Sequence, residues 1–175
     1  MAGASSPSTT TAHRLESQQI MEIERSFLVA HDPPEAPERV EHIEQGYLAI
    51  DRDGTEVRVR RRDAEFTLTV KSPDGGRTRL EEELSLDAER FERLWPLTEG
   101  RRLDKDRHLL SLPDGLTAEL DVYGGSLAGL RVVEVEFGSA RAGDDFEPPG
   151  WFGLEVTDDG RYRNRELAVH GRPSA

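Results

Sequence analysis

Most of the chain after residue 20 alternates between hydrophobic and polar positions, a period of two that is typical of β-strands. Between Val57 and Arg62, for example, two valines alternate with arginines. Turn signals such as Asp53-Gly54 separate the alternating segments, and together they predict eight antiparallel strands. The predicted strands cover residues 21–30, 40–50, 56–62, 65–71, 77–86, 107–112, 116–123 and 130–137.

Two segments have a helical pattern instead. Asp87 is a good N-cap, and Phe91, Leu94 and Trp95 follow it at helical spacing, which predicts a helix that ends near Leu97. A second, short helix is expected at 163–169. The fold class is therefore mainly β with a few helices, an α+β arrangement.

The polar faces of the predicted strands carry like-charged side chains at alternate positions. Residues two apart on a strand point to the same side, so each set presents its charges to one face. The acidic sets are Glu22 with Glu24, Glu81 with Glu83, Glu119 with Asp121, and Glu134 with Glu136. The basic sets are Arg58 with Arg60 and Arg62, Arg77 with Arg79, and Lys105 with Arg107. Paired carboxylates favour hard divalent cations and paired cations favour phosphate, which predicts a site for a metal-bound polyphosphate.

Two arrangements of such strands are open. In an ordinary layered sheet the charged faces would meet water. In the other arrangement, about eight strands close into an antiparallel β-barrel whose charged faces point inward and whose apolar outer faces are covered by helices. We favour the barrel, because a solvated surface usually mixes charges of both signs. Eight strands leave an interior wide enough for a small ligand.

Composition narrows the class of protein. The 175 residues fit one domain, and 35% hydrophobic residues suffice for a core. A net charge of −12 argues against nucleic-acid binding, and the lack of cysteine excludes disulfides and thiolate zinc sites. No segment resembles a membrane span or a secretory signal, so we expect a cytoplasmic protein. Residues 1–19 are rich in Ser, Thr and Ala and are expected to form a disordered tail before a single domain at 20–173, with Met21 as an alternative start.

An ordered series of motifs resembles the CYTH superfamily, whose members are also called triphosphate tunnel metalloenzymes. Residues 22–29, which begin Glu22-Ile23-Glu24, resemble the N-terminal Glu-x-Glu-x-Lys motif of that family. The likeness covers nearly the whole chain after Met21. In detail, the sequence is most similar to the short bacterial inorganic triphosphatases of that family. The further matching segments are 44–48, 57–60, 68–72, 119–122, 133–137, 151–153, 155–157 and 161–164.

The resemblance implies an eight-stranded tunnel that holds a linear triphosphate with Mg²⁺ or Mn²⁺ as cofactor. The implied metal ligands are Glu22, Glu24, Glu134 and Glu136, with help from Glu119 and Asp121. The implied phosphate-binding residues are Arg58, Arg60, Lys71, Arg79, Lys105, Arg107 and Arg161. The implied catalytic residues are Glu22, Glu24, Tyr47 and Lys105. Glu81 and Glu83 are expected to orient these cations or to bind outer-shell water, and Tyr47 to position a phosphate oxygen or the attacking water.

Ser26 departs from the family motif, which has Lys at this position. Parity places Ser26 on the same face as Glu24, whereas Arg25 points to the opposite face and cannot replace the missing cation. One lost charge-assisted phosphate contact corresponds to about 1.5–3 kcal/mol, or one to two decades in affinity or rate. We therefore expect weakened but real activity.

Three functions remain open from the sequence. We favour metal-dependent hydrolysis of inorganic triphosphate (tripolyphosphate) to pyrophosphate and phosphate. The alternatives are an enzyme for an organic triphosphate, such as a thiamine triphosphatase or an adenylate cyclase, and a non-catalytic domain that binds polyphosphate or nucleotide. The aromatic content of 6% offers little platform for a base. The expected partner is a small-molecule triphosphate, with neither nucleic acid nor membrane, and formation of a homodimer is left open.

Overall fold

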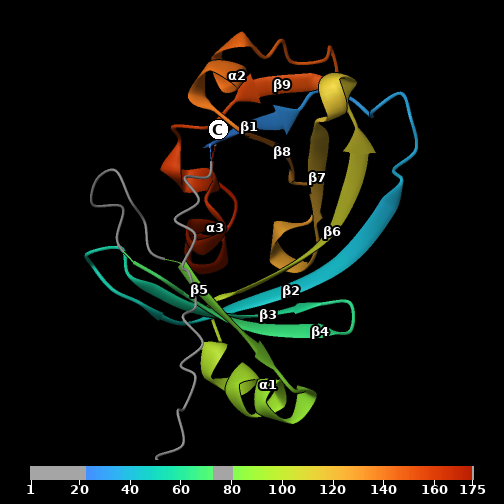
Figure 1. The fold of residues 1–175 in the computed structure, drawn as a ribbon. Helices are drawn as coiled ribbons and strands as arrows, with labels where there is room; N and C mark the ends of the chain where they lie inside the picture. The colour runs from blue at the N-terminus through green and yellow to red at the C-terminus, as the bar shows by residue number, and fades with distance from the viewer. Residues whose placement is uncertain (1–22, 73–80, 175) are drawn as a thin grey trace, which may run out of the picture.

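Nine antiparallel strands form one curved sheet in the computed structural model, which describes residues 23–72 and 81–174 (Figure 1). The strand order is β5-β4-β3-β2-β6-β7-β8-β1-β9. The strands are β1 (Ile23–Val29), β2 (Arg39–Ile50), β3 (Glu56–Arg62), β4 (Glu65–Lys71), β5 (Glu81–Leu86), β6 (Arg102–Ser111), β7 (Thr117–Tyr123), β8 (Arg131–Phe137) and β9 (Phe152–Glu155).

Short helices connect and cover the strands. They are α1 (Ala88–Leu94), α2 (Ala140–Asp145) and α3 (Asn164–His170), with 3₁₀ turns η1 (Trp95–Thr98), η2 (Pro113–Gly115), η3 (Gly125–Leu127) and η4 (Gly160–Tyr162). The predicted N-cap is confirmed, since the Asp87 side chain accepts a hydrogen bond from the Arg90 amide at 2.8 Å. None of the helices in the described part of the chain is long and apolar enough to cross a membrane.

The prediction of a closed, eight-stranded barrel is wrong. In the described residues the sheet is open, with β5 and β9 as its two edges. The physical reason lies at β1, which pairs with β8 on one side and with the unpredicted strand β9 on the other. β9 therefore occupies the edge that a closing strand would need. The other edge strand, β5, begins only at Glu81, and the predicted strand residues 77–80 lie outside the described part of the chain.

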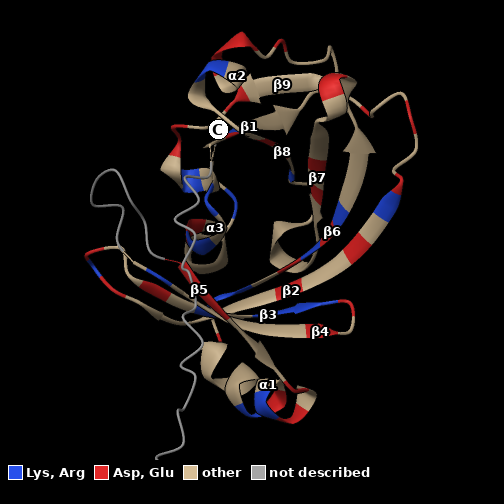
Figure 2. Ribbon diagram, in the orientation of Figure 1, with Lys and Arg blue, Asp and Glu red and all other residues tan. Residues whose placement is uncertain are grey.

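Strand register places the predicted like-charged sets on one face of the sheet, as the parity of the sequence predicted. Directly opposed residues of an antiparallel pair point to the same side. Glu24 of β1 opposes Glu136 of β8, and Lys71 of β4 opposes Glu81 of β5. Figure 1 shows that the sheet curves around this face, and Figure 2 shows basic β3 on one arm of the arch and acidic positions of β7 on another.

The convex face of the sheet carries the larger hydrophobic core. Its buried members are Phe27, Leu110, Ala118, Leu120, Val133, Val135, Phe137, Trp151 and Phe152. Helix α2 packs over β1 and β8 on this side, and α1 packs over β4 through Phe91, whose ring lies 5.0 Å from that of Phe66. The expectation that helices cover the apolar outer face is confirmed for these strands.

A second apolar cluster lies on the concave face and was not predicted. It joins Tyr47, Leu103, Tyr123 and Val132 of the sheet to Leu127 and Leu130, and to Leu167 and Ala168 of α3. Leu167 is 1% exposed, and burial of a leucine contributes about 1.5–3 kcal/mol. The cluster therefore holds α3 inside the arch, beside the charged face (Figure 1).

Candidate functional site

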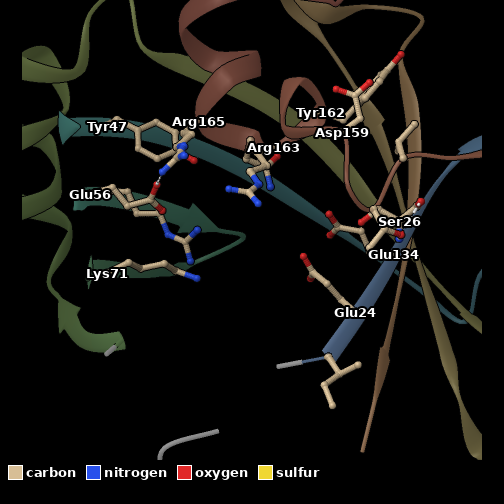
Figure 3. Close-up of a pocket in the computed structure, with 15 residues that line it drawn as sticks. Glu24, Ser26, Tyr47, Glu56, Lys71, Glu134, Asp159, Tyr162, Arg163 and Arg165 are labelled. Atoms are coloured by element: carbon tan, nitrogen blue, oxygen red, sulfur yellow. Dashed lines mark hydrogen bonds and ion pairs between the residues drawn. The ribbon is translucent and has the colours of Figure 1, made fainter. Parts of the chain in front are cut away.

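A cavity of about 510 Å³ lies on the concave face, between the two arms of the sheet. Figure 3 shows carboxylates of β1 and β8 on one side, Tyr47, Glu56 and Lys71 on the other, and Arg163 and Arg165 beside α3 between them. The lining residues are Ile23, Glu24, Ser26, Tyr47, Glu56, Arg58, Lys71, Glu134, Val156, Thr157, Asp159, Tyr162, Arg163, Asn164 and Arg165.

Glu24 and Glu134 form the acidic side of the cavity. Ser26 lies beside Glu24 on β1 and opposes Glu134 of β8 in the strand register. All three residues line the cavity, which confirms the prediction that Ser26 shares the face of Glu24. Burial raises the pKa of Glu134, with Asp121 and Glu119 adding to the rise while Lys105 and Arg107 oppose it.

Arg25 points to the opposite face, as predicted. Its guanidinium forms an ion pair with Glu155 of β9 at 2.7 Å and donates to the carbonyl oxygens of Gly143 and Phe146 at 3.0 Å each. It therefore stabilises the contact of β1 with β9 and α2 and takes no part in the cavity.

Arg58 and Lys71 form the basic side, and Glu81 holds both. Lys71 Nζ lies 2.5 Å from Glu81 Oε2, and Arg58 Nη2 lies 3.5 Å from Glu81 Oε1. Glu81 thus orients these cations, as expected from the sequence. The Arg58 Nε atom is buried, and among the described residues it has no hydrogen-bond partner. A buried donor without an acceptor costs about 1–3 kcal/mol, a cost that an anionic ligand removes.

Arg163 and Arg165 line the cavity although the sequence analysis did not assign them to the site. They lie at the start of α3, which is fixed to the sheet by a hydrogen bond of 2.8 Å from the Tyr123 hydroxyl to Asn164 Oδ1. The alternation of arginines at 161, 163 and 165 was the available signal. Arg161 itself is not brought to the cavity: its side chain is 63% exposed and pairs with Asp159 at 2.7 Å.

Lys105, Arg107 and Asp121 form a buried ion-pair network behind the acidic side, and none of them lines the cavity. Asp121 is fully buried; its Oδ1 accepts from Arg107 Nε at 2.7 Å, and Lys105 Nζ donates to its Oδ2. Arg107 also pairs with Glu119 and, at 3.0 Å, with Glu134. Glu119 and Asp121, which were predicted as metal ligands, are therefore paired with the side chains of Arg107 and Lys105 in this structure.

The network determines which of its members changes protonation closest to neutral pH. Burial lowers the pKa of Lys105 to about 8, although the charge of Asp121 opposes this. Burial would raise the pKa of Asp121, but Lys105 and Arg107 together lower it. Because Arg107 contributes a permanent charge to the same carboxylate, Asp121 stays ionised and Lys105 is the labile partner.

Arg60, Gln45 and Tyr47 form a second polar chain on the concave face. Arg60 Nε donates to Gln45 Oε1 at 2.9 Å, and Gln45 Nε2 donates to the Tyr47 hydroxyl oxygen at 2.8 Å. Burial, with the charges of Arg58 and Arg62, lowers the pKa of Arg60 to about 10. Arg60 itself does not line the cavity, whereas Tyr47 does.

Two predicted site residues, Glu22 and Arg79, lie outside the described residues. Of the six predicted metal ligands, Glu24 and Glu134 line the cavity, and Glu136 opposes Glu24 on the same face. In the part of the chain that the structure describes, no group of three or more His, Asp or Glu side chains is positioned to hold a metal ion. Mg²⁺ is commonly held by one or two carboxylates together with water and substrate phosphates. The oxygen donors on this side fit a cation that is shared with a bound phosphate chain.

The chain is similar to proteins of one named activity. It is 49% identical over 148 residues to an inorganic triphosphatase from Nitrosomonas europaea, covering 85% of this chain and 97% of that protein. It is 36% identical over 147 residues to an inorganic triphosphatase from Acetivibrio thermocellus, covering 83% and 92%. A crystal structure of an inorganic triphosphatase superposes with a TM-score of 0.71 at 45% identity, covering 89% of this chain and 98% of that one. No family model matches the chain.

Proposed function

Because this chain belongs to the bacterial inorganic triphosphatases of the CYTH superfamily, we propose that it hydrolyses inorganic triphosphate to pyrophosphate and phosphate with Mg²⁺ or Mn²⁺ as cofactor. The reaction takes place in the cavity on the concave face.

The observation that carries this proposal is the division of the cavity into two charged sides. Arg58, Lys71, Arg163 and Arg165 line the same space as Glu24 and Glu134. A linear triphosphate needs several cations along its length, and the carboxylates on the other side suit a divalent cation bound to it. The buried Arg58 Nε, which lacks an acceptor among the described residues, supports an anionic ligand in particular.

Glu24 and Glu134 hold the metal in this proposal, with Glu136 and Glu22 as further ligands. When held there, a divalent cation would supply charge neutralisation of the phosphates and acidification of water. Arg107 fixes the Glu134 carboxylate by its 3.0 Å ion pair, and Asp121, which is itself paired with Lys105, in turn fixes Arg107. Lys105, Arg107 and Asp121 therefore act as positioning residues, which replaces the direct phosphate or metal contacts expected from the sequence.

Hydrolysis of a phosphoanhydride requires mainly that the chain be held in line with the attacking water and that negative charge on the leaving oxygen be stabilised. Arg58 and Lys71 grip one end of the triphosphate, while Arg163 and Arg165 reach it from α3. These preorganised charges account for most of the expected rate enhancement. No Ser or His nucleophile is required.

The proposal is tested by initial rates of phosphate release from tripolyphosphate, ATP and thiamine triphosphate, each with Mg²⁺, Mn²⁺ or EDTA. We expect release from tripolyphosphate to be fastest and to stop in EDTA. Faster release from ATP or thiamine triphosphate would favour the organic-triphosphate alternative. Metal-independent release would contradict the assigned role of the carboxylates.

A further inference from the structure

A second cavity, which we call the outer groove, lies beside the larger hydrophobic core on the convex side of the sheet. Its volume is about 1070 Å³, and none of its lining residues also lines the cavity on the concave face. The segments that form it are the loop between β1 and β2, the end of β6 with the turn η2, helix α2, and the loop that precedes β9. The outer groove is therefore a separate feature that the proposed reaction does not use.

The floor of the outer groove is apolar and continuous with the larger core. Leu110 and Trp151 are buried members of that core, whereas Leu112, Leu116 and Phe146 are only partly buried against it. The lining also includes four prolines, whose fixed backbone angles make the groove largely preformed. They are Pro33, Pro34, Pro113 and Pro149. Apolar surface that stays open to solvent and is rimmed by polar groups is typical of a docking site.

The rim of the outer groove carries carboxylates but no Lys or Arg. The whole chain, by contrast, has 23 Lys and Arg beside 35 Asp and Glu. The carboxylates are Asp32, Glu35, Glu38, Asp114, Asp145 and Glu147. All of them are exposed, and Figure 2 shows acidic positions on the loop between β1 and β2 and at η2. Among the described residues only Asp32 and Asp145 form ion pairs, so the other carboxylates lack a cationic partner there.

The charge of the rim decides between the candidate occupants of the groove. A second copy of this chain has a net charge of −12 and would be repelled, and the chain's own residues 1–22 carry one Arg against two Glu. A polyamine would satisfy the carboxylates but would leave the apolar floor without contact. A basic peptide that also carries apolar side chains complements both the rim and the floor.

We propose that the outer groove is a docking site for a basic peptide segment of a partner protein, in which Lys or Arg residues are interspersed with apolar ones. The basic side chains pair with the carboxylates of the rim, and the apolar side chains cover Leu112, Leu116 and Phe146. A partner bound in this way leaves the cavity on the concave face open. The inference goes beyond the proposed function and is independent of it.

The test selects binders from a displayed library of random twelve-residue peptides on the wild-type protein and measures the selected peptides by titration calorimetry. A groove variant removes three carboxylates that have no ion pair among the described residues, by Glu35→Gln, Asp114→Asn and Glu147→Gln. A matched control variant removes the same charge from exposed positions outside the groove, by Glu65→Gln, Glu92→Gln and Glu99→Gln. Circular dichroism of both variants checks that the fold is kept.

We expect the selected peptides to combine several Lys or Arg residues with apolar ones. They should bind the groove variant about tenfold more weakly than the wild type and the control variant within about twofold of it. Serine in place of the apolar residues of a selected peptide should also weaken binding about tenfold or more.

The inference would be overturned if no such peptide were enriched. Equal losses in the two variants would also overturn it, because they would show only a general attraction to an acidic protein. So would a serine-substituted peptide, or spermine, that bound as tightly as the selected peptides. Failure of the wild type to hydrolyse tripolyphosphate would refute the proposed function and leave these peptide measurements unchanged.

Two further measurements address the other occupants. Wild type and groove variant should sediment alike, whereas a wild-type dimer that the groove substitutions dissociate would assign the groove to a second copy. A double variant, Leu15→Ser with Ile20→Ser, removes apolar residues from the N-terminal segment and should bind the selected peptides like the wild type. Binding that was about threefold tighter or more would assign the groove to this segment and overturn the inference.

Discussion

Ser26 places a short, neutral side chain on the acidic side of the cavity, where related motifs carry Lys. Its backbone is held firmly: the amide donates to Thr157 Oγ1 at 3.0 Å, and the carbonyl accepts from the Val156 amide at 2.8 Å. The position is therefore set by β1 and its neighbours. The identity of the side chain at position 26 alone therefore determines whether this part of the cavity carries a positive charge.

Ser26→Lys tests this position. The new ammonium would lie beside Glu24 and Glu134 and reach into the cavity, so we expect kcat/KM for tripolyphosphate to rise about tenfold or more, since a charge-assisted contact is worth about 1.5–3 kcal/mol. Ser26→Met, which adds length without charge, is the matched control and should give no rise. An unchanged rate in the lysine variant would contradict the expectation that Ser26 weakens the activity.

Lys71 and Arg161 were both predicted to bind phosphate, but only Lys71 lines the cavity. We expect Lys71→Met to raise KM for tripolyphosphate about tenfold or more, because it removes one charged contact from the basic side. Arg161→Met should leave KM within about twofold of the wild type. Initial-rate kinetics of the two variants, measured side by side, would refute this division of roles if both lost affinity equally.

Residue identities predicted part of the site. Glu24, Tyr47, Arg58, Lys71 and Glu134 were assigned from the sequence and do line one cavity. Arg163 and Arg165 were missed because they lie at the N-terminus of α3, as its N-cap and in its first turn, where no strand parity applies. The internal pairing of Asp121 with two cations was also not predictable, since a pattern of like charges does not show which opposite charges it will meet.

At the scale of single elements, strand parity was the reliable signal. A shift of register by one residue moves every side chain to the other face, so a strand with one charged and one apolar face has little freedom. β9 was missed for the opposite reason: it has only four residues, FGLE, with no strong alternation. That short strand occupies the free edge of β1 and makes closure between β1 and β5 impossible.

Arg25 and Glu155 link β1 to β9, and this link predicts a pH dependence. The hydrogen bond from Arg25 lowers the pKa of Glu155. Because the folded state binds the proton less tightly than the unfolded chain, the ion pair stabilises the fold above the ordinary glutamate pKa of about 4.3 and is lost as pH falls through the lowered pKa. We expect Glu155→Gln to cost at most about 1 kcal/mol at pH 7, since the pair is partly exposed, and nothing below both pKa values.

Urea unfolding of the wild type and Glu155→Gln at several pH values measures this difference. Arg25→Met is the stronger variant, because it also removes two hydrogen bonds to carbonyl oxygens and the contact with the Phe27 ring at 5.1 Å. We expect a loss of about 2 kcal/mol from it at pH 7. A wild-type advantage over Glu155→Gln that grew as pH fell would contradict the assigned sign.

The whole molecule combines a net charge of −12 with a cavity that has a strongly basic side. A nucleic acid would be repelled by the overall charge, while a small anion needs to meet only the local cations. The curved sheet brings the basic strand β3 and Lys71 of β4 to face Glu24 of β1 and Glu134 of β8, and α3 fills part of the space between them (Figures 1 and 2). The charged faces thus point inward, as predicted, although the sheet that carries them is open and does not form the expected closed barrel.

A phosphorus NMR time course of tripolyphosphate with Mg²⁺, recorded for the wild type and for Glu24→Gln, tests this account of the cavity. The wild type should convert tripolyphosphate into equal amounts of pyrophosphate and phosphate. Glu24→Gln should fold normally but give no metal-dependent conversion, because it removes a carboxylate from the acidic side. Stable tripolyphosphate with the wild type, or equal rates with the two proteins, would contradict the account.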